Sequence, residues 1–430
     1  MSIRGVGSSS LLAVFLLALA VRFAFLAIAG PHTGGDSPEY VTLAHNIAVH
    51  NGYTLGTATP FIPMVRRAPA YPALVALITG HGPAHPYRIA AVQILLDSAV
   101  AAAILLLTPA VPMNGVRIAA AVIYAIHPAA VAASSTLLSE ALFTFLVACS
   151  ALFVIAARRA DRPALSIIAG VVMGLSILCR PIAMVYGACA VVVLLAWRSK
   201  TRALGHAAAF LAGCAVTVLP WTIRCTAVTG RLVIAQAAGI TNWYLPTRWD
   251  WNQNDQETLW REFAKDPYGQ RLNAARTPAE IVAASGFGTE LAIRNVKANP
   301  RAYLVSRIRT YPHLFISTLG GTIGVEQTLG TVFAERRFGT AALMGGLLVV
   351  FSLIPIAAAA VGLPRALRDP AGALCGALVI ATLLVHLPMW IEYRYWLPVL
   401  PYELALAATG VCVLRGLLDR RGAERKQEDS

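Results

Sequence analysis

Two acidic residues, Asp36 and Glu39, lie three positions apart directly after the first long apolar run of the chain. A carboxylate such as that of Asp36 can accept the proton of a hydroxyl or amine nucleophile during a group transfer. Asp36 is equally suited to cap a helix that begins near Pro38, with Glu39 completing a variant capping box. The two roles are compatible, because the start of a helix is a rigid mount.

Arginines form a second group of candidates, and they stand close to the ends of apolar runs. Arg66 and Arg67 precede a proline-punctuated apolar segment that starts near Ala70. A guanidinium can bind two phosphate oxygens at once, so this pair is predicted to hold a phosphate group. The alternative for one of the pair is contact with lipid headgroups.

The elements that must position these residues are membrane helices. The chain has 430 residues and a mean hydropathy of +0.65, and only 13% of its residues are charged, against roughly a quarter in an average soluble protein. We expect an all-α polytopic membrane protein with about 10 (10–12) transmembrane helices. The spans are predicted near 11–30, 88–108, 114–132, 136–157, 164–179, 181–197, 205–222, 339–361, 371–390 and 397–414. An eleventh could lie at 303–325.

The distribution of positive charge predicts the orientation. The net charge is +14, and the basic residues cluster at 158–162, 198–202, 365–368 and 415–426, between or after apolar runs. Such clusters mark cytoplasmic loops. We therefore expect a multi-pass protein of a bacterial inner membrane with both termini in the cytoplasm and an uncleaved first helix. Nucleic acid is excluded as a partner, because no basic stripe with interleaved aromatic residues occurs.

This topology divides the chain into six parts. Two long segments face outward, 31–87 and 223–338. The second is polar, then basic and amphipathic, and is predicted to form interfacial helices and a small outward loop domain. The other parts are 1–30 with the first helix, the transmembrane regions 88–222 and 339–414, and a cytoplasmic tail at 415–430.

Charges at the outward ends of the spans run against the positive-inside bias. Arg180, Arg224 and Arg394 all fall there, which indicates that an anion on that side recruits them. Glu140 lies just inside an outward end, where an acid needs a partner or a wet cavity. It is a candidate second carboxylate that binds the acceptor or orients an arginine. Deeper in the membrane, we expect Arg22 and Asp97 to pair, because they lie at similar depth.

Several motifs at span ends, taken in order, resemble the GT-C superfamily of glycosyltransferases, most closely the glycosyltransferase family 39 group. That group includes protein O-mannosyltransferases, lipid A aminoarabinose transferases and bacterial lipopolysaccharide glycosyltransferases. Within residues 240–340, only the segment 299–304 is similar to these families, and only in general style. The motifs are Asp36–Tyr40, Arg66–Pro72, Thr136–Leu142, Leu178–Pro181, Leu219–Arg224 and Glu392–Pro398.

The resemblance implies a GT-C-like bundle that moves a sugar from a polyprenyl-phosphate donor to a glycan, lipid or protein acceptor, at the outer face of the membrane. The catalytic base would be Asp36, although some members carry adjacent Asp and Glu in this loop. No nucleotide-binding motif is present, and no cofactor is required, although Asp36 and Glu140 could bind a divalent metal. The expected substrate-binding residues are Glu39, Tyr40, Arg66, Arg67, Tyr71, Glu140, Arg180, Arg224, Tyr393 and Arg394.

Two alternatives remain open. A polysaccharide polymerase or O-antigen ligase would also use outward arginines and a lipid-linked donor, but it would not be expected to have an acidic first loop. A transporter or flippase of lipid-linked glycans would favour charges near the bilayer midplane and two repeated halves. Here the charges of interest gather at one surface, and no repeat is visible.

Overall fold

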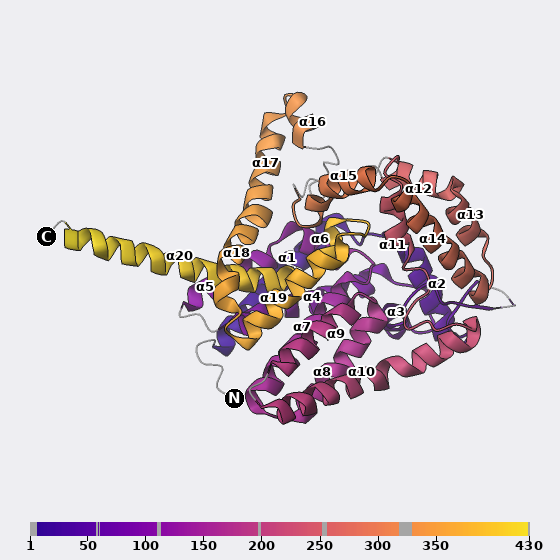
Figure 1. Ribbon diagram of the computed structural model, residues 1–430, viewed down its shortest axis with the longest axis horizontal. Coiled ribbons are helices and arrows are strands. Elements are labelled where there is room, and N and C mark those ends of the chain that lie inside the picture. The colour runs from indigo at the N-terminus through magenta and orange to yellow at the C-terminus, as the bar shows by residue number, and fades with distance from the viewer. Residues whose placement is uncertain are drawn as a thin grey trace.

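The computed structural model describes residues 7–56, 59, 61–109, 113–196, 199–251, 256–317 and 329–428. This part of the chain is almost entirely helical (Figure 1). Its only sheet is an antiparallel hairpin of two short strands, β1 (Thr54–Leu55) and β2 (Ile62–Pro63). The fold is therefore an all-α bundle, as its composition predicts.

Six helical units in the described residues are long and apolar enough to cross a membrane, which makes the chain a multi-pass membrane protein. They are α1 (Ser8–Ala29), α4 (Pro86–Leu107), α7 (Glu140–Ala160), α10 (Lys200–Thr229), α17 (Phe338–Leu348) continued through η4 (Val349–Leu353) into α18 (Ile354–Ala366), and α20 (Leu400–Glu428).

The other predicted spans coincide with shorter or broken apolar helices. A pair bent by 49° would be a seventh span, α5 (Asn114–Ala125) and α6 (Pro128–Ser135). Three helices of 10–17 residues occupy the remaining positions: α8 (Pro163–Cys179), α9 (Ala183–Leu195) and α19 (Pro370–His386). The helices thus match the predicted positions, while the number of complete crossings stays a prediction. For the possible span at 303–325, residues 318–325 lie outside the described residues.

The break between α5 and α6 is explained by a proline and a buried arginine. Pro128 has no N–H to continue the hydrogen bonding of α5, and Arg22 Nη1 donates to the carbonyl of Ala125, the last residue of α5, at 2.8 Å. Arg22 Nε also donates to Asp97 Oδ2 at 2.7 Å. The hydroxyl of Tyr124 donates to Asp97 Oδ1 at 2.7 Å. The predicted pairing of Arg22 with Asp97 is confirmed.

Glycines bring two helix pairs into close contact. A Cβ atom at Gly170 of α8 would lie 2.0 Å from the carbonyl oxygen of Phe210 in α10. At Gly410 of α20 it would lie 1.8 Å from the carbonyl oxygen of Ala358 in α18. Small residues of this kind allow membrane helices to pack backbone to backbone. The close contacts fix α8, which ends at the candidate site, and α20, which begins beside it.

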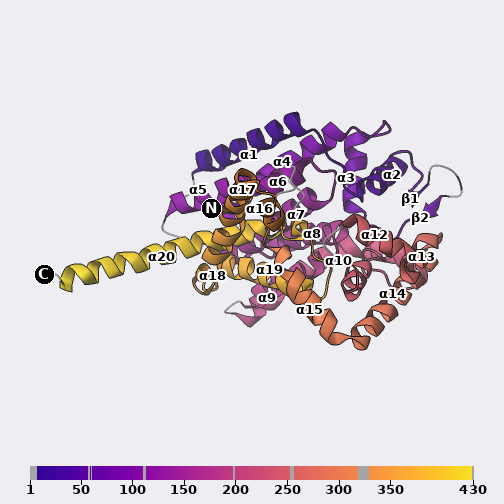
Figure 2. The same cartoon turned by 90° about the horizontal axis from the view of Figure 1, so that it is seen from above.

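The two segments predicted to face outward, 31–87 and 223–338, are called the first and second outward segments. Most of both lies at the end of the molecule remote from the C-terminal end of α20, whereas α16 (Leu329–Ala334) lies beside α17 (Figures 1 and 2). The first contains α2 (Ser37–Ala48), the hairpin and α3 (Ala70–Thr79). The second has its own hydrophobic core, which includes Tyr244, Phe263 and Tyr268. Its elements are α11 (Thr241–Tyr244), η1 (Leu245–Thr247), α12 (Gln256–Lys265), α13 (Pro267–Ala274), α14 (Pro278–Ala298), α15 (Pro300–Thr310), η2 (Tyr311–Leu314) and α16 (Leu329–Ala334).

Candidate active site

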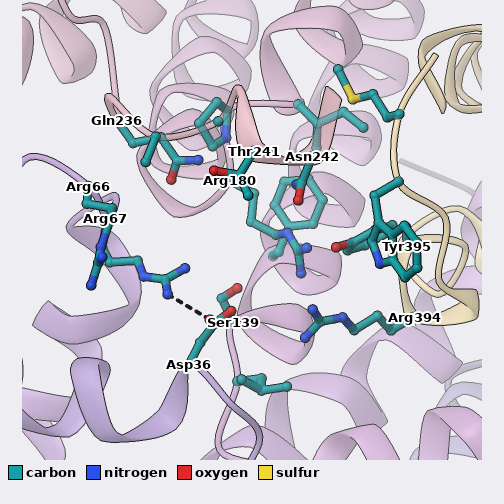
Figure 3. A pocket seen from close by; sticks show the side chains of 18 of the residues that line it. Asp36, Arg66, Arg67, Ser139, Arg180, Gln236, Thr241, Asn242, Arg394 and Tyr395 are labelled. Carbon is teal, nitrogen blue, oxygen red and sulfur yellow. Dashed lines mark hydrogen bonds and ion pairs between the residues drawn. The ribbon is translucent and has the colours of Figure 1, made fainter. Parts of the chain in front are cut away.

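A cavity of about 630 Å³ lies between the first outward segment, the facing ends of α7 and α8, and the second outward segment. Residues 389–398, between α19 and α20, complete its wall through η5 (Tyr393–Tyr395). Figure 3 shows several of these side chains directed into it. Eight of the eleven predicted site residues line the cavity: Asp36, Glu39, Tyr40, Arg66, Arg67, Glu140, Arg180 and Arg394.

The two acids of the first loop are bound by the two neighbouring arginines. Arg67 Nη2 donates to Asp36 Oδ1 at 2.7 Å, and Arg67 Nε donates to Glu39 Oε2 at 2.5 Å. Arg66 pairs with the other oxygen of Glu39. The guanidinium of Arg67 also lies 5.7 Å from the ring centre of Tyr40. One arginine therefore bridges both carboxylates and fixes their directions.

This arrangement corrects the predicted capping role. Asp36 occupies the N-cap position of α2, but its side chain makes no capping hydrogen bond, and its backbone is helical (φ −86°, ψ −14°) rather than extended. Glu39 is engaged by Arg66 and Arg67, so no capping box forms. The reason is the strength of the competing partners, since charge-assisted hydrogen bonds to guanidinium are stronger than those to a neutral amide.

The Asp36 loop is tied to the segment that precedes Glu140. The Leu137 N–H donates to the His32 carbonyl at 2.9 Å, and the His32 N–H donates to the Ser135 carbonyl at 3.0 Å, which pairs His32 with Thr136 in a parallel bridge. Ser37 Oγ donates to the Leu137 carbonyl at 2.7 Å and accepts from the Gly34 N–H at 2.9 Å. Asp36 and Glu140 are therefore mounted on one hydrogen-bonded unit, although about a hundred residues separate them in the sequence.

A buried glutamine extends this unit into the bundle. Gln93 of α4 donates to the Thr136 carbonyl at 2.7 Å and accepts from the Tyr71 hydroxyl at 2.6 Å. Tyr71, one of the predicted substrate-binding residues, is fully buried and lies outside the cavity lining. Its ring packs edge-on against Tyr40 at 4.9 Å between centroids. Tyr71 thus packs behind Tyr40, which lines the cavity.

Glu140 and two arginines form the opposite charged side of the cavity. Glu140 Oε1 lies 2.7 Å from Arg180 and 3.9 Å from Arg394. The Glu140 side chain is only 6% exposed, while those of Arg180 and Arg394 are 22% and 33% exposed. Arg394 also pairs with Glu392. Figure 3 shows both guanidinium groups directed toward the middle of the cavity, where they can bind an anion.

Tyr395 and Tyr40 complete this polar surface. The guanidinium groups of Arg180 and Arg394 lie 5.5 Å and 5.3 Å from the ring centre of Tyr395. Burial raises the pKa of Tyr40, although Arg67 lowers it. The Tyr40 hydroxyl therefore stays protonated at neutral pH and can donate a hydrogen bond. Tyr395 is not among the residues predicted from the sequence to bind substrate, because nothing in one sequence shows which way its side chain faces.

Two further predicted substrate-binding residues lie outside the cavity. Arg224 donates to the carbonyls of Met64 at 2.7 Å and Tyr53 at 3.0 Å, and it stacks on Trp221 at 4.7 Å. It therefore holds the hairpin of the first segment against α10. The Tyr393 hydroxyl lies 3.2 Å from His127 Nε2, away from the cavity lining. Neither residue is placed where it would contact a ligand in the cavity.

One whole wall of the cavity is not predicted from the sequence. It consists of uncharged residues of the second outward segment, among them Gln236, Asn242 and Trp260. This segment has neither long apolar periodicity nor a matching motif, so no signal in the sequence indicated it. In the described residues, no group of three or more His, Cys, Asp or Glu side chains is arranged to hold a metal ion.

Comparison with known proteins identifies the fold. No family model matches the sequence, and no curated protein matches it. The solved oligosaccharyltransferase AglB from Archaeoglobus fulgidus, in complex with an inhibitory peptide and a dolichol-phosphate, is 13% identical with a TM-score of 0.53. The match covers 97% of this chain and 51% of that one.

Two further solved structures are similar. The apo form of the Archaeoglobus fulgidus oligosaccharyltransferase is 15% identical over 98% of this chain and 51% of its own, with a TM-score of 0.54. ArnT from Cupriavidus metallidurans, bound to undecaprenyl phosphate, is 15% identical over 94% of this chain and 78% of its own, with a TM-score of 0.38. The chain thus spans about half the length of the oligosaccharyltransferase.

Proposed function

Since the chain has the fold of the GT-C glycosyltransferase superfamily, we propose that it is an inverting glycosyltransferase. It takes a hexose or pentose from a polyprenyl phosphate and transfers it to a glycan, lipid or protein acceptor. The observation that carries the proposal is the meeting of one carboxylate, Asp36, with two partly exposed arginines, Arg180 and Arg394, in one cavity.

The reaction is a single displacement at the anomeric carbon of the sugar. The acceptor oxygen or nitrogen attacks this carbon and forms the new glycosidic bond, while the bond to the phosphate oxygen breaks. Asp36 accepts the proton of the acceptor group. The bridge from Arg67 holds the Asp36 carboxylate in a fixed direction, which keeps the base aligned with its target.

The departing group is the polyprenyl phosphate, and it gains negative charge as the bond breaks. Arg180 and Arg394 are the side chains best placed to stabilise that charge. Arg66 and Arg67 take a positioning role, because their guanidinium groups bind Glu39 and Asp36. A lipid-linked donor is supported by the similar oligosaccharyltransferase, which was solved with a dolichol-phosphate.

The direction of α7 supports an outward orientation of the cavity. This helix starts at Glu140 in the cavity wall and ends beside Arg158 and Arg159, about 30 Å away at 1.5 Å per residue. Asp161 follows and pairs with Arg202 at 2.5 Å. The basic end is the expected cytoplasmic end, so the proposed active site faces outward from the inner membrane.

The rival functions fit the charges less well. A transporter would place uncompensated charges along a path through the bundle. Arg22 and Asp97, which lie inside the bundle, are both buried, and their opposite charges neutralise each other. A polymerase or ligase acting without a carboxylate base would have no use for Asp36, which lines the cavity.

Analysis of lipid-linked sugars in a deletion strain tests the proposal. If the chain consumes a polyprenyl-phosphate sugar, one such lipid accumulates in the deletion strain and one envelope glycan, lipid or protein loses the corresponding residue. Re-expression of the intact chain restores both, whereas re-expression of Asp36→Asn restores neither. An unchanged pool of lipid-linked sugars together with intact glycans would contradict the function.

A further inference from the structure

The cavity has two chemically different sides. The charged side contains the acids and arginines described above. The other side is formed by the second outward segment, and none of its lining residues is charged. We call this side the neutral wall; its polar and aromatic members are Gln236, Thr241, Asn242, Trp260, Phe263 and Asn273.

The amide groups of the neutral wall have no partners in the described part of the protein. The side chains of Gln236, Asn242 and Asn273 make no hydrogen bond with any described residue. Figure 3 shows the amides of Gln236 and Asn242 directed into the cavity, in the part of the view away from Asp36. Each amide offers one acceptor oxygen and two N–H donors. Gln236 and Asn242 are half-buried, whereas Asn273 is exposed. Half-buried amides such as the first two are stabilised by a ligand that supplies their hydrogen bonds.

Amides with a structural role in this chain look different. Asn46 donates to the carbonyls of Thr54 at 2.8 Å and Gly56 at 2.9 Å. Gln93 donates to Thr136 and accepts from Tyr71. Both are fully paired within the protein, so the unpaired amides of the neutral wall stand apart from them.

The backbone on which the amides stand is held in place. On either side of Gln236, the Ala235 carbonyl accepts from the Trp221 indole at 2.9 Å, and the Ala237 N–H donates to the Val65 carbonyl at 2.8 Å. The Asn242 carbonyl accepts from the backbone N–H of Trp390 at 2.5 Å. A binding group mounted on fixed backbone loses little entropy when a ligand arrives.

An exposed aromatic ring lies in the same wall. Trp260 of α12 is 46% exposed, and its ring packs edge-on against Phe263 at 5.6 Å. Its free face can cover an apolar surface of a ligand. A sugar ring presents both hydroxyl groups, which amides can bind, and an apolar C–H face, which an aromatic ring can cover. A phosphate or carboxylate ligand would need cationic side chains, which this wall lacks. A polyprenyl chain would leave the amides unpaired.

We propose that Gln236, Asn242, Asn273 and Trp260 form a sugar-binding subsite that recognises the hydroxyl pattern of one ring. The inference rests on the proposed function and deepens it, because it divides the cavity into a phosphate-binding side and a sugar-selecting side. The ring comes either from the lipid-linked donor or from the end of a glycan acceptor. The amides bind the hydroxyls, and Trp260 packs against the C–H face.

Binding to the full chain in lipid nanodiscs tests the subsite. The donor probes are undecaprenyl phosphate alone and undecaprenyl phosphate linked to a panel of hexoses and pentoses. The acceptor probes are methyl glycosides of the same sugars, added in the presence of undecaprenyl phosphate. The variants are the double substitution Gln236→Ala/Asn242→Ala and the single substitution Trp260→Ala. Gln270→Ala and Trp249→Ala, both exposed and outside the cavity lining, are the matched controls.

The expected result is a preference for one sugar that the wall variants lose by about tenfold or more, since two hydrogen bonds or one stacked ring are removed. Their affinity for bare undecaprenyl phosphate stays at the wild-type level. If the wall variants lose the preference among the undecaprenyl-phosphate-linked sugars, the subsite binds the donor sugar. If they lose the preference among the methyl glycosides, it binds the acceptor sugar. Wild-type sugar preference in the wall variants, or no preference in either arm, overturns the subsite.

Failure of the proposed function would appear differently. In that case bare undecaprenyl phosphate would not bind to the wild-type chain, or its binding would be insensitive to Arg180→Ala. A chain that binds the lipid phosphate through Arg180 but shows no role for the neutral wall leaves the proposed function standing and removes only the subsite.

Discussion

Arg67 Nη2 lies 2.7 Å from Asp36 Oδ1, across 31 positions of the sequence. The same guanidinium binds Glu39 through Nε, so the planar geometry of a single side chain sets the spacing of both acids. Only arginine has donors arranged in this way. The contact joins the start of α2 to the loop before α3, and it places the proposed base at the edge of the cavity.

Substituting Arg67 by lysine is expected to impair catalysis while leaving donor binding intact. A lysine ammonium cannot bridge two carboxylates in the fixed geometry of a guanidinium. The resulting misplacement of Asp36 should lower kcat by about ten- to a hundredfold, with KM for the lipid-linked donor nearly unchanged. Initial rates in isolated membranes measure both. Arg231→Lys, at an exposed position outside the cavity lining, is the control; an Arg67→Lys enzyme as fast as this control would remove the positioning role.

Variants of Glu140 and Arg180 can distinguish an effect on protein stability from an effect on ligand binding. Arg180→Ala leaves the buried Glu140 carboxylate with only the 3.9 Å contact to Arg394. Breaking a buried pair in this way costs up to about 3–5 kcal/mol, so the melting temperature should fall. Glu140→Ala/Arg180→Ala should recover much of the melting temperature, because no unpaired buried charge remains.

The same double variant should still bind undecaprenyl phosphate at least about tenfold more weakly than wild type, since charge-assisted hydrogen bonds to the phosphate are lost. Thermal melting and lipid binding are measured on the same purified samples. If the stabilised double variant bound the lipid phosphate as wild type does, Arg180 would have no part in the phosphate site.

The pair of Arg22 and Asp97 provides a structural prediction away from the cavity. Asp97→Leu should reduce the amount of folded protein in membranes sharply, because the Arg22 guanidinium is completely buried and would lose its counter-ion. Arg22→Leu/Asp97→Leu should recover most of it, with transfer activity retained. Tyr124→Phe, which removes one hydrogen bond to Asp97, should cost only about 1 kcal/mol. The amount of protein that stays folded after extraction in detergent is measured for each variant. Equal amounts for Asp97→Leu and for the double variant would contradict the pairing.

Much of the bundle could be predicted from the sequence because lipid imposes a simple rule on the backbone. Every membrane segment must satisfy its own hydrogen bonds, so apolar runs become helices. Arg22 and Asp97 lie at similar depths in their apolar runs, and this similarity is enough to predict that they pair. The same rule, with the positions of span ends, indicated Asp36, Arg180 and Arg394 as residues of one surface.

The sequence could not show which distant groups bind the donors of each arginine or the carboxylate of Asp36. Arg224 satisfies the same span-end pattern as Arg180, yet the hairpin carbonyls of Tyr53 and Met64 occupy its donors. Asp36 fits a helix cap locally, but Arg67 competes successfully for its carboxylate. The neutral wall lies in a segment without a repeating apolar pattern, so its residues become visible only when the fold places them beside the charged side.

Sugar transfer by membranes containing Asp36→Asn decides whether Asp36 is the catalytic base. Asparagine keeps the size of the side chain but cannot act as the base. If Asp36 is the base, the variant loses transfer by at least about a hundredfold, while expression and binding of undecaprenyl phosphate stay at the wild-type level. Asp161→Asn, at the opposite end of α7, is the matched control and should transfer sugar as wild type does. Transfer by Asp36→Asn at the rate of the Asp161→Asn control would show that Asp36 is not the base.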